Sequence, residues 1–250
     1  VKQNGNNTSV EIKNTRQFVP GKFQIVINQN GRKIEQDFTW GVLAINPNKA
    51  VFLPNEEAKL DLAVLDENGK MVCNANVKLI ITSPSGQQTE LSTQNKLIKV
   101  NSECKIKDIV LKPDYETKYL VQDSGIYKMS LTAETKNGTY SIEDYFQVKD
   151  SVAFDIERST ATRIYPPKPY PVLLTITANE DFKGEITEII PKSFEAIKSE
   201  TYTSFNKEEV INNERILYWQ VSLKKGEQIK LGYDYNAPDI SPQFYLLGPL

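Results

Sequence analysis

The chain has 250 residues, which is room for about two domains of common size and part of a third. Its 30 basic and 32 acidic residues leave a net charge of -2, which excludes the broad positive surface of a nucleic-acid-binding domain. The chain contains no histidine, which excludes Ser-His-Asp and Cys-His catalysis and His-ligated zinc or haem.

Carboxylates are the remaining candidates for catalysis. Two of them can cleave a glycoside, but such a pair needs a cleft. The acidic residues here are scattered along alternating segments and turns, so we interpret them as solvated surface. No apolar run approaches the roughly 20 residues of a membrane-spanning helix. We therefore expect a non-enzymatic segment with no catalytic residue, cofactor or metal site, and with no membrane span.

Residues 1–40 predict two or three strands. Two of them, 21–28 and 33–40, are joined by Asn30-Gly31, a dipeptide typical of a two-residue hairpin turn. A segment of this size cannot bury a sandwich core. We interpret 1–40 as the C-terminal hairpin of a truncated immunoglobulin-like domain, whose open edges could accept a strand from another chain.

Residues 41–150 predict one full sandwich. Apolar and polar residues alternate with a period of two in 59–64, 77–81 and 127–132. Turn residues such as Asn68-Gly69 and Pro84-Ser85-Gly86 separate these strands. Short strands with frequent hairpin turns are typical of immunoglobulin-like sandwiches.

Asp123, Gly125 and Tyr127 resemble a tyrosine corner, in which a tyrosine early in a late strand hydrogen-bonds to backbone a few residues upstream. The alternative is an ordinary turn followed by a buried aromatic residue. Either way we interpret these three residues as structural.

Cys73 and Cys104 are the only cysteines, and both lie in 41–150. In an exported protein such a pair favours a disulfide, which would stabilise the domain by about 3–4 kcal/mol. The alternative is two buried thiols in a cytosolic protein. Two cysteines without histidine do not suffice for a closed zinc site.

Residues 151–250 predict a second sandwich, which follows the short linker 149–151. Its last full strand is expected at 228–235, and 206–213 is expected to form a helical turn with Asn206 as its cap. The prolines after residue 237 predict an extended exit toward a further module.

Aromatic residues gather near the ends of this second segment. They could form an exposed platform that stacks sugars or docks a protein, or they could pack in the core and between domains. The candidate binding aromatics are Tyr165, Tyr170, Tyr202, Tyr233 and Tyr235, with Phe205, Phe244 and Tyr245 nearby. Calcium at the domain junction, near Asp150 or Asp155, is a further alternative.

Part of the middle segment resembles a known family. Residues 50–58 hold a proline-led turn, 62–66 a strand before Asn68-Gly69, and 72–86 a strand of small and β-branched residues that ends in Pro84-Ser85-Gly86. In this order they resemble the macroglobulin-type sandwich of the α2-macroglobulin family and of bacterial surface proteins. That family's thioester motif is Cys-Gly-Glu-Gln, whereas the related string here, 225–228, begins with lysine. The resemblance therefore implies a fold and not covalent trapping of proteases.

The last segment resembles the repeat modules of bacterial surface proteins. The likeness rests on 182–191, a strand that ends in proline, and on 217–227, where a Trp-bearing strand leads to a Gly-Glu turn. This resemblance implies an immunoglobulin-like sandwich of the surface-repeat type in 151–250.

Together these observations predict an all-β chain of tandem immunoglobulin-like, macroglobulin-type sandwiches. We expect an extracellular structural or adhesive module of a larger bacterial cell-surface protein, which contacts protein or glycan or self-associates into a filament. One alternative is an accessory glycan- or protein-binding region of a secreted enzyme. Another is a macroglobulin-like protease inhibitor fragment without a thioester.

Overall fold

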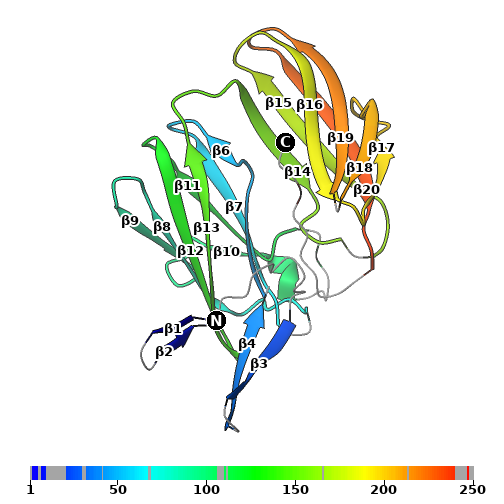
Figure 1. Ribbon diagram of the computed structural model, residues 1–250. Coiled ribbons are helices and arrows are strands. Elements are labelled where there is room, and N and C mark those ends of the chain that lie inside the picture. The colour runs from blue at the N-terminus through cyan, green and yellow to red at the C-terminus, as the bar shows by residue number, and fades with distance from the viewer. Residues whose placement is uncertain are drawn as a thin grey trace.

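The computed structural model describes residues 2–4, 7–9, 21–29, 32–40, 42–66, 69–105, 110, 112–164, 166–212, 214–239 and 247. Regular structure in these ranges consists of β-strands and one turn of 3-10 helix, η2 (Ser102–Lys105). The prediction of an all-β chain is confirmed. Figure 1 shows two sandwiches side by side, with a separate hairpin below them.

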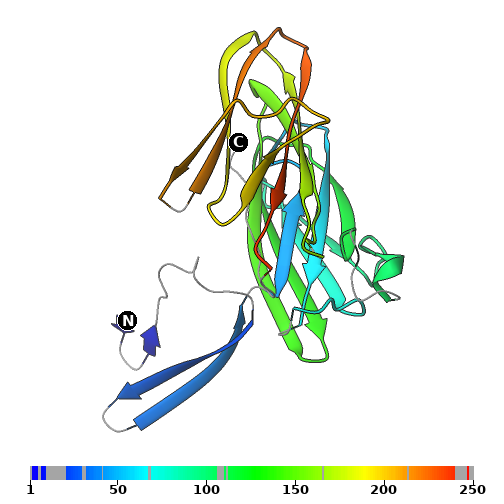
Figure 2. The ribbon, with the colours of Figure 1, turned by 90° about the vertical axis from the view of Figure 1, so that its right-hand side faces the viewer.

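Two hairpins precede the sandwiches. β1 (Lys2–Asn4) pairs with β2 (Asn7–Ser9), and β3 (Gly21–Gln29) pairs with β4 (Arg32–Trp40) along its whole length. Gln29 lies opposite Arg32, so two residues connect β3 and β4 as the sequence predicted, although that turn lies outside the described residues. Figure 2 shows the β3–β4 hairpin extending away from the sandwiches. Its assignment to a truncated domain stays a prediction.

The first sandwich has a four-stranded and a five-stranded sheet. The four-stranded sheet has the order β10 (Lys99–Val100), β11 (Tyr115–Leu120), β7 (Glu57–Val64) and β5 (Leu43–Pro47). The five-stranded sheet has the order β6 (Val51–Phe52), β13 (Gly138–Val148), β12 (Gly125–Thr135), β8 (Asn76–Thr82) and β9 (Gln88–Ser92). β5 pairs with β7 in one sheet, and β6 pairs parallel with β13 in the other. This is the strand order of an immunoglobulin fold whose first strand is divided between both sheets.

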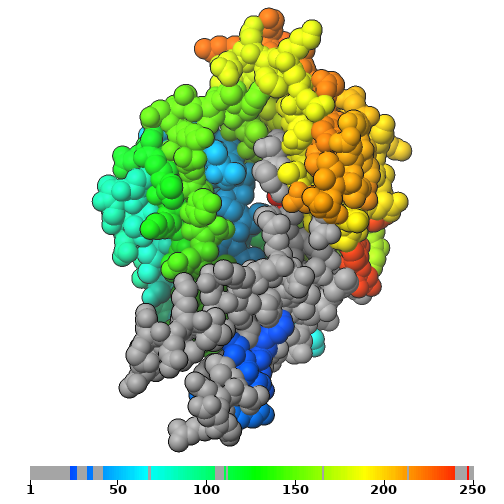
Figure 3. Space-filling model, in the orientation of Figure 1, coloured from blue at the N-terminus to red at the C-terminus, as the bar shows by residue number. Residues whose placement is uncertain are grey.

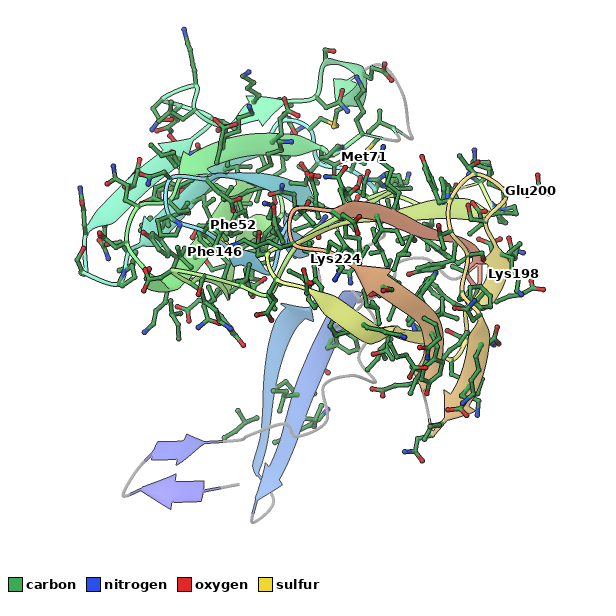
Figure 4. All side chains as sticks on the ribbon, turned by 90° about the horizontal axis from the view of Figure 1, so that it is seen from above. Phe52, Met71, Phe146, Lys198, Glu200 and Lys224 are labelled. Atoms are coloured by element: carbon green, nitrogen blue, oxygen red, sulfur yellow. A yellow bond between two sulfur atoms is a disulfide. The ribbon has the colours of Figure 1, made fainter. Side chains whose placement is uncertain are left out.

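Alternation along the strands builds the first core. Every second residue of β7, of β8 and of β12 from Tyr127 to Ala133 is buried, because successive side chains of a strand point to opposite faces. At the centre, the Phe146 ring stacks on Tyr127 with centroids 5.1 Å apart and meets Phe52 edge-on at 5.2 Å. Figure 4 labels Phe52 and Phe146, which lie close together in the first sandwich. Burying one such ring stabilises the fold by about 1.5–3 kcal/mol.

The second sandwich has its own core. One sheet has the order β14 (Phe154–Thr160), β15 (Tyr170–Ala178), β20 (Gln228–Asn236) and β17 (Glu195–Lys198). The other has the order β16 (Phe182–Pro191), β19 (Glu214–Leu223) and β18 (Lys207–Ile211). Its last two strands, β19 and β20, lie in opposite sheets, whereas β12 and β13 form a hairpin within one sheet. The two sandwiches therefore differ in topology.

The predicted helical turn at 206–213 is wrong. Residues 207–211 form β18, which pairs with β19 from Lys207 opposite Tyr218 to Ile211 opposite Glu214. Asn206 does not cap a helix, because its side-chain oxygen accepts a hydrogen bond from the backbone of Gln220. Residues 210 and 211 are β-branched, which favours a strand, and the strand is stabilised by its pairing with β19. These effects outweigh the local helix signal of a cap followed by acidic residues.

Candidate binding site and the junction between the sandwiches

Three of the five candidate binding aromatics lie in the core of the second sandwich and not on an exposed platform. Tyr170, Tyr233 and Tyr235 are 3%, 0% and 2% exposed and belong to the core of the second sandwich. The physical reason is strand alternation, which turns Tyr233 and Tyr235 inward on β20 and Tyr170 inward on β15. The burial of these three residues corresponds to the packing alternative. Tyr165, Phe244 and Tyr245 lie outside the described residues.

Tyr202 lies elsewhere, against the outer face of the sheet that contains β20. A Cβ atom on Gly232 would lie 2.8 Å from Tyr202 Cδ2, so only glycine lets Tyr202 approach the strand this closely. The next residue is bound to β20 by its backbone: the Thr203 amide donates to the Lys230 carbonyl at 3.2 Å, and the Thr203 carbonyl accepts from the Gly232 amide at 3.0 Å. Tyr202 follows Lys198 and Glu200, which Figure 4 labels at one end of the second sandwich. Its position is therefore fixed by the strand beneath it.

Beside Tyr202 the surface is hollowed over a volume of about 400 Å³. The polar lining comes from Ser159, Thr160 and Lys168. The Lys168 Nζ lies 5.3 Å from the centroid of the Tyr170 ring, a distance at which the ring attracts a cation. The apolar lining comes from Ala161, Pro169, Tyr170, Pro171, Leu173 and Tyr202. Two of the candidate binding aromatics, Tyr170 and Tyr202, therefore line the same hollow.

A second hollow of about 290 Å³ lies on the outer face of the five-stranded sheet. Its lining is polar, and its members bond to one another: the Asn76 amide donates to Glu134 at 2.9 Å. Side chains that already satisfy each other are typical of a solvated sheet face. We assign no ligand to this surface.

The junction between the sandwiches contains a buried ion pair. Arg163, which follows β14, donates from Nη2 to both carboxylate oxygens of Asp114, just before β11, at 2.9 and 3.2 Å. Asp114 is 2% exposed. Burial raises the pKa of Asp114 above its usual value even though the Arg163 charge opposes the shift. This contact holds two segments 49 residues apart in the chain.

A second group of contacts lies where β5 leads into β6. Lys49 Nζ is 2.9 Å from Glu56 in its own sandwich and 2.6 Å from Asp155 on β14. Burial lowers the pKa of Lys49, but hydrogen bonds and charge from these two carboxylates outweigh it and leave the pKa raised. Next to it, the Asn48 side chain donates to Glu157 at 3.1 Å.

Figure 3 shows the two sandwiches as two lobes that face one another.

A charged group also lies inside the second sandwich. Glu188 on β16 is fully buried, and Arg158 on β14 binds both of its oxygens, at 3.1 Å through Nε and 2.7 Å through Nη2. The Tyr233 hydroxyl donates to the same carboxylate at 3.2 Å. Burial raises the pKa of Glu188, and Arg158 and Tyr233 oppose that shift. Alternating strand patterns contain no signal for such a pair across two sheets.

Asp61 is the most perturbed carboxylate outside these pairs. It lies on β7 opposite Glu116 on β11. Burial, and secondly repulsion from Glu116, raise the pKa of Asp61 from 3.8 to about 6, while Lys59 opposes the shift. The folded state thus binds this proton more tightly than the unfolded state does. The stability that Asp61 contributes is complete below pH 3.8 and is lost as the pH rises through about 6.

Replacing Asp61 with asparagine should therefore stabilise the protein at pH 7.5 by about 1–2 kcal/mol, which is less than the full equivalent of a two-unit pKa shift because solvent screens this partly exposed side chain. The gain over the natural chain should disappear near pH 4. Urea unfolding of both proteins across this pH range measures it, with Glu90→Gln on an exposed strand as the control. A gain that does not change with pH would contradict the assignment to Asp61 ionisation.

The structural residues predicted in the first sandwich have the following geometry. The Tyr127 hydroxyl accepts hydrogen bonds from the amides of Asp123 at 3.0 Å and Gln122 at 3.3 Å. Cys73 and Cys104 form a disulfide with 5.7 Å between their Cα atoms. It ties the turn before β8 to η2.

The carboxylates considered for calcium have other partners. Asp155 contacts Lys49, and Asp150 accepts a hydrogen bond from the Ser124 hydroxyl. In the described ranges, no three acidic or cysteine side chains come together as metal ligands would. Over the same ranges, no helix has the length and apolar character to cross a membrane.

By its architecture the chain is a tandem β-sandwich protein. No protein-family model matches it. No curated protein matches its sequence. Among solved structures it is similar to a putative membrane anchored protein from Corynebacterium diphtheriae, with a TM-score of 0.30 and 9% identity over 92% of this chain and 63% of that one. It is also similar to chitinase ChiA74 from Bacillus thuringiensis, with a TM-score of 0.24 and 11% identity over 82% of this chain and 28% of the chitinase. The chain spans less than two thirds of either protein.

Proposed function

We propose that this chain is a non-enzymatic, extracellular structural segment of a larger surface protein, in which the two sandwiches hold a fixed angle. The observation that carries the proposal is the buried Asp114–Arg163 pair, which joins the sandwiches across the junction. A flexible link between independent domains would not bury a carboxylate, because an unpaired buried charge costs several kcal/mol. The junction therefore transmits orientation from one sandwich to the next.

The disulfide supports an extracellular location, since disulfides form and persist in oxidising compartments. An adhesive role and a macroglobulin-type origin remain finer proposals within the same class. The accessory-region alternative needs a row of exposed aromatics, and Tyr170, Tyr233 and Tyr235 do not supply one. Self-association through the β3–β4 hairpin also stays a proposal.

Small-angle X-ray scattering of the full chain tests the fixed angle. The natural protein should scatter as one arrangement of the two sandwiches. The triple variant Lys49→Gln, Asp114→Asn, Arg163→Gln removes the Asp114–Arg163 pair and leaves the Glu56 and Asp155 carboxylates without the lysine between them. Its scattering should require a range of arrangements and give a larger radius of gyration.

Lys118→Met is the matched control, because it breaks an exposed pair with Glu57 inside the first sandwich. Its curve should superimpose on that of the natural chain. If the natural chain itself needs a range of arrangements, or if the triple variant scatters unchanged, the junction does not fix the angle and the proposal fails.

A further inference from the structure

The hollow beside Tyr202 offers a prearranged aromatic wall. Tyr202 packs on the backbone at Gly232, where a Cβ atom would also lie 3.1 Å from the Val172 carbonyl oxygen. Its amide donates to the Ser199 hydroxyl at 3.2 Å, which fixes the start of the loop. Because the ring is already ordered, contact with a ligand costs little further conformational entropy. The hollow of about 400 Å³ is also within the range of small-ligand sites.

The charge at the hollow is positive. Lys168 is the only charged side chain among the described residues that line it. The carboxylates of β14 that face the first sandwich are already engaged, Asp155 by Lys49 and Glu157 by Asn48. Asp234 lies opposite Pro171 in the strand register but is not part of the lining. The local charge therefore favours an anionic ligand.

The uncharged lining residues restrict the kind of anionic ligand further. Pro169, Pro171 and Leu173 extend the apolar surface beside Tyr202. On the neighbouring strand β14, Ser159 supplies a hydroxyl, whereas the Thr160 hydroxyl already donates to the Pro171 carbonyl at 3.0 Å. A free phosphate would leave the apolar walls unused, and a purely apolar ligand would give the Lys168 ammonium, which lies over the Tyr170 ring, no anionic partner. A sugar ring with a carboxylate can use both the apolar wall and the lysine charge. Its C–H face can lie on an aromatic ring, its carboxylate can pair with the ammonium group, and its hydroxyl groups can hydrogen-bond to a hydroxyl side chain.

We propose that this hollow binds a hexuronic acid unit of an anionic polysaccharide, with the sugar's C–H face against Tyr202 and its carboxylate toward Lys168. The site is independent of the fixed junction angle. It would give a structural segment a contact with acidic cell-surface or matrix glycan.

Titration of the full ¹⁵N-labelled chain with trigalacturonate, followed by NMR, tests the proposal. Amide shifts should saturate and should map to the strap 166–169, the loop around Tyr202 and the end of β14. Galactotriose, which lacks the carboxylates, should bind more weakly by about three- to fivefold, the ratio expected for losing one exposed charge contact. A glutamate hexapeptide should not bind in this range.

Two variants assign the contacts. Lys168→Gln lies on an exposed strap, so the fold should be unaffected, and affinity for trigalacturonate should fall to that of galactotriose. Lys192→Gln removes the same charge from an exposed turn and should bind like the natural chain. Tyr202→Ala should abolish saturation for both sugars.

Three results would overturn the assignment: no saturable shifts with trigalacturonate, equal binding of the acidic and neutral sugars, or equal binding of the glutamate peptide. A loss in Lys192→Gln as large as in Lys168→Gln would also overturn it, because the attraction would then be general charge. None of these outcomes changes the scattering of the natural chain, so this proposal and the junction proposal fail separately.

Discussion

Replacing Arg158 with methionine is expected to destabilise the second sandwich by about 3–5 kcal/mol at pH 7.5. The substitution leaves Glu188 fully buried without its cation, with the Tyr233 hydroxyl as its remaining side-chain donor. The cost of an uncompensated buried charge is much larger than the net value of the pair itself. Urea unfolding followed by Trp219 fluorescence measures the effect, because Trp219 lies in the same core.

The pH dependence of the stability deficit distinguishes an uncompensated Glu188 charge from a loss of packing around residue 158. Without Arg158, nothing but Tyr233 opposes the upward shift of the Glu188 pKa that burial causes. Glu188 should then take up a proton at a higher pH than in the natural chain, so the deficit should shrink as the pH is lowered. The double variant Arg158→Met, Glu188→Met should recover most of the stability, since an apolar pair of similar volume can replace a buried ion pair.

Lys224→Met is the control, because it breaks an exposed pair with Asp181 in the same sandwich. It should unfold like the natural chain. A deficit in Arg158→Met that is independent of pH, or a double variant as unstable as the single one, would show that Arg158 acts through its packing and not through Glu188.

Local pattern predicted the strands well, and the reason is physical. Period-two alternation reports which face of a strand is buried, so β7, β8, β12 and β20 could be located from the sequence. Tight turns depend on neighbouring residues, so the β3–β4 connection was also predictable. The exception was 206–213, where the ladder to β19 outweighed a local helix signal.

The junction was not predictable in this way. Asp114 and Arg163 are 49 residues apart, and each belongs to a segment whose pattern predicts only surface or loop. Glu188 sits in an alternating strand and would be placed inside by its position, but nothing local names Arg158 as its partner. Side-chain pairs across sheets and between sandwiches depend on the tertiary fold. The local pattern of a single sequence does not identify the partners.

Aromatic residues illustrate a further limit. A tyrosine suits both a core and a binding surface, so composition cannot decide between them. Strand phase decides it: Tyr233 and Tyr235 share the inward phase of β20. For Tyr202 the informative neighbour is Gly232, which leaves space over the strand, and the two are 30 residues apart in the chain.

The second large effect is expected at the disulfide. The variant Cys73→Ser, Cys104→Ser should lose about 4 kcal/mol of stability in the first sandwich, from the entropy released to the unfolded chain by opening a loop of this length. Urea unfolding in a Trp40→Phe background measures the loss: far-UV circular dichroism follows both sandwiches, and the fluorescence of Trp219, then the chain's one tryptophan, reports the second sandwich in the same sample. The transition of the second sandwich should be unchanged.

The same bond tests the extracellular location. In protein isolated from its native source under alkylating conditions, both cysteines should resist labelling until a reductant is added. The natural chain treated with reductant should then unfold like the serine variant, because both lack the cross-link. Free, alkylated thiols in the native protein would contradict an oxidising compartment. A protected pair whose reduction leaves the stability unchanged would contradict the stabilising role of the bond and leave the assignment of the location intact.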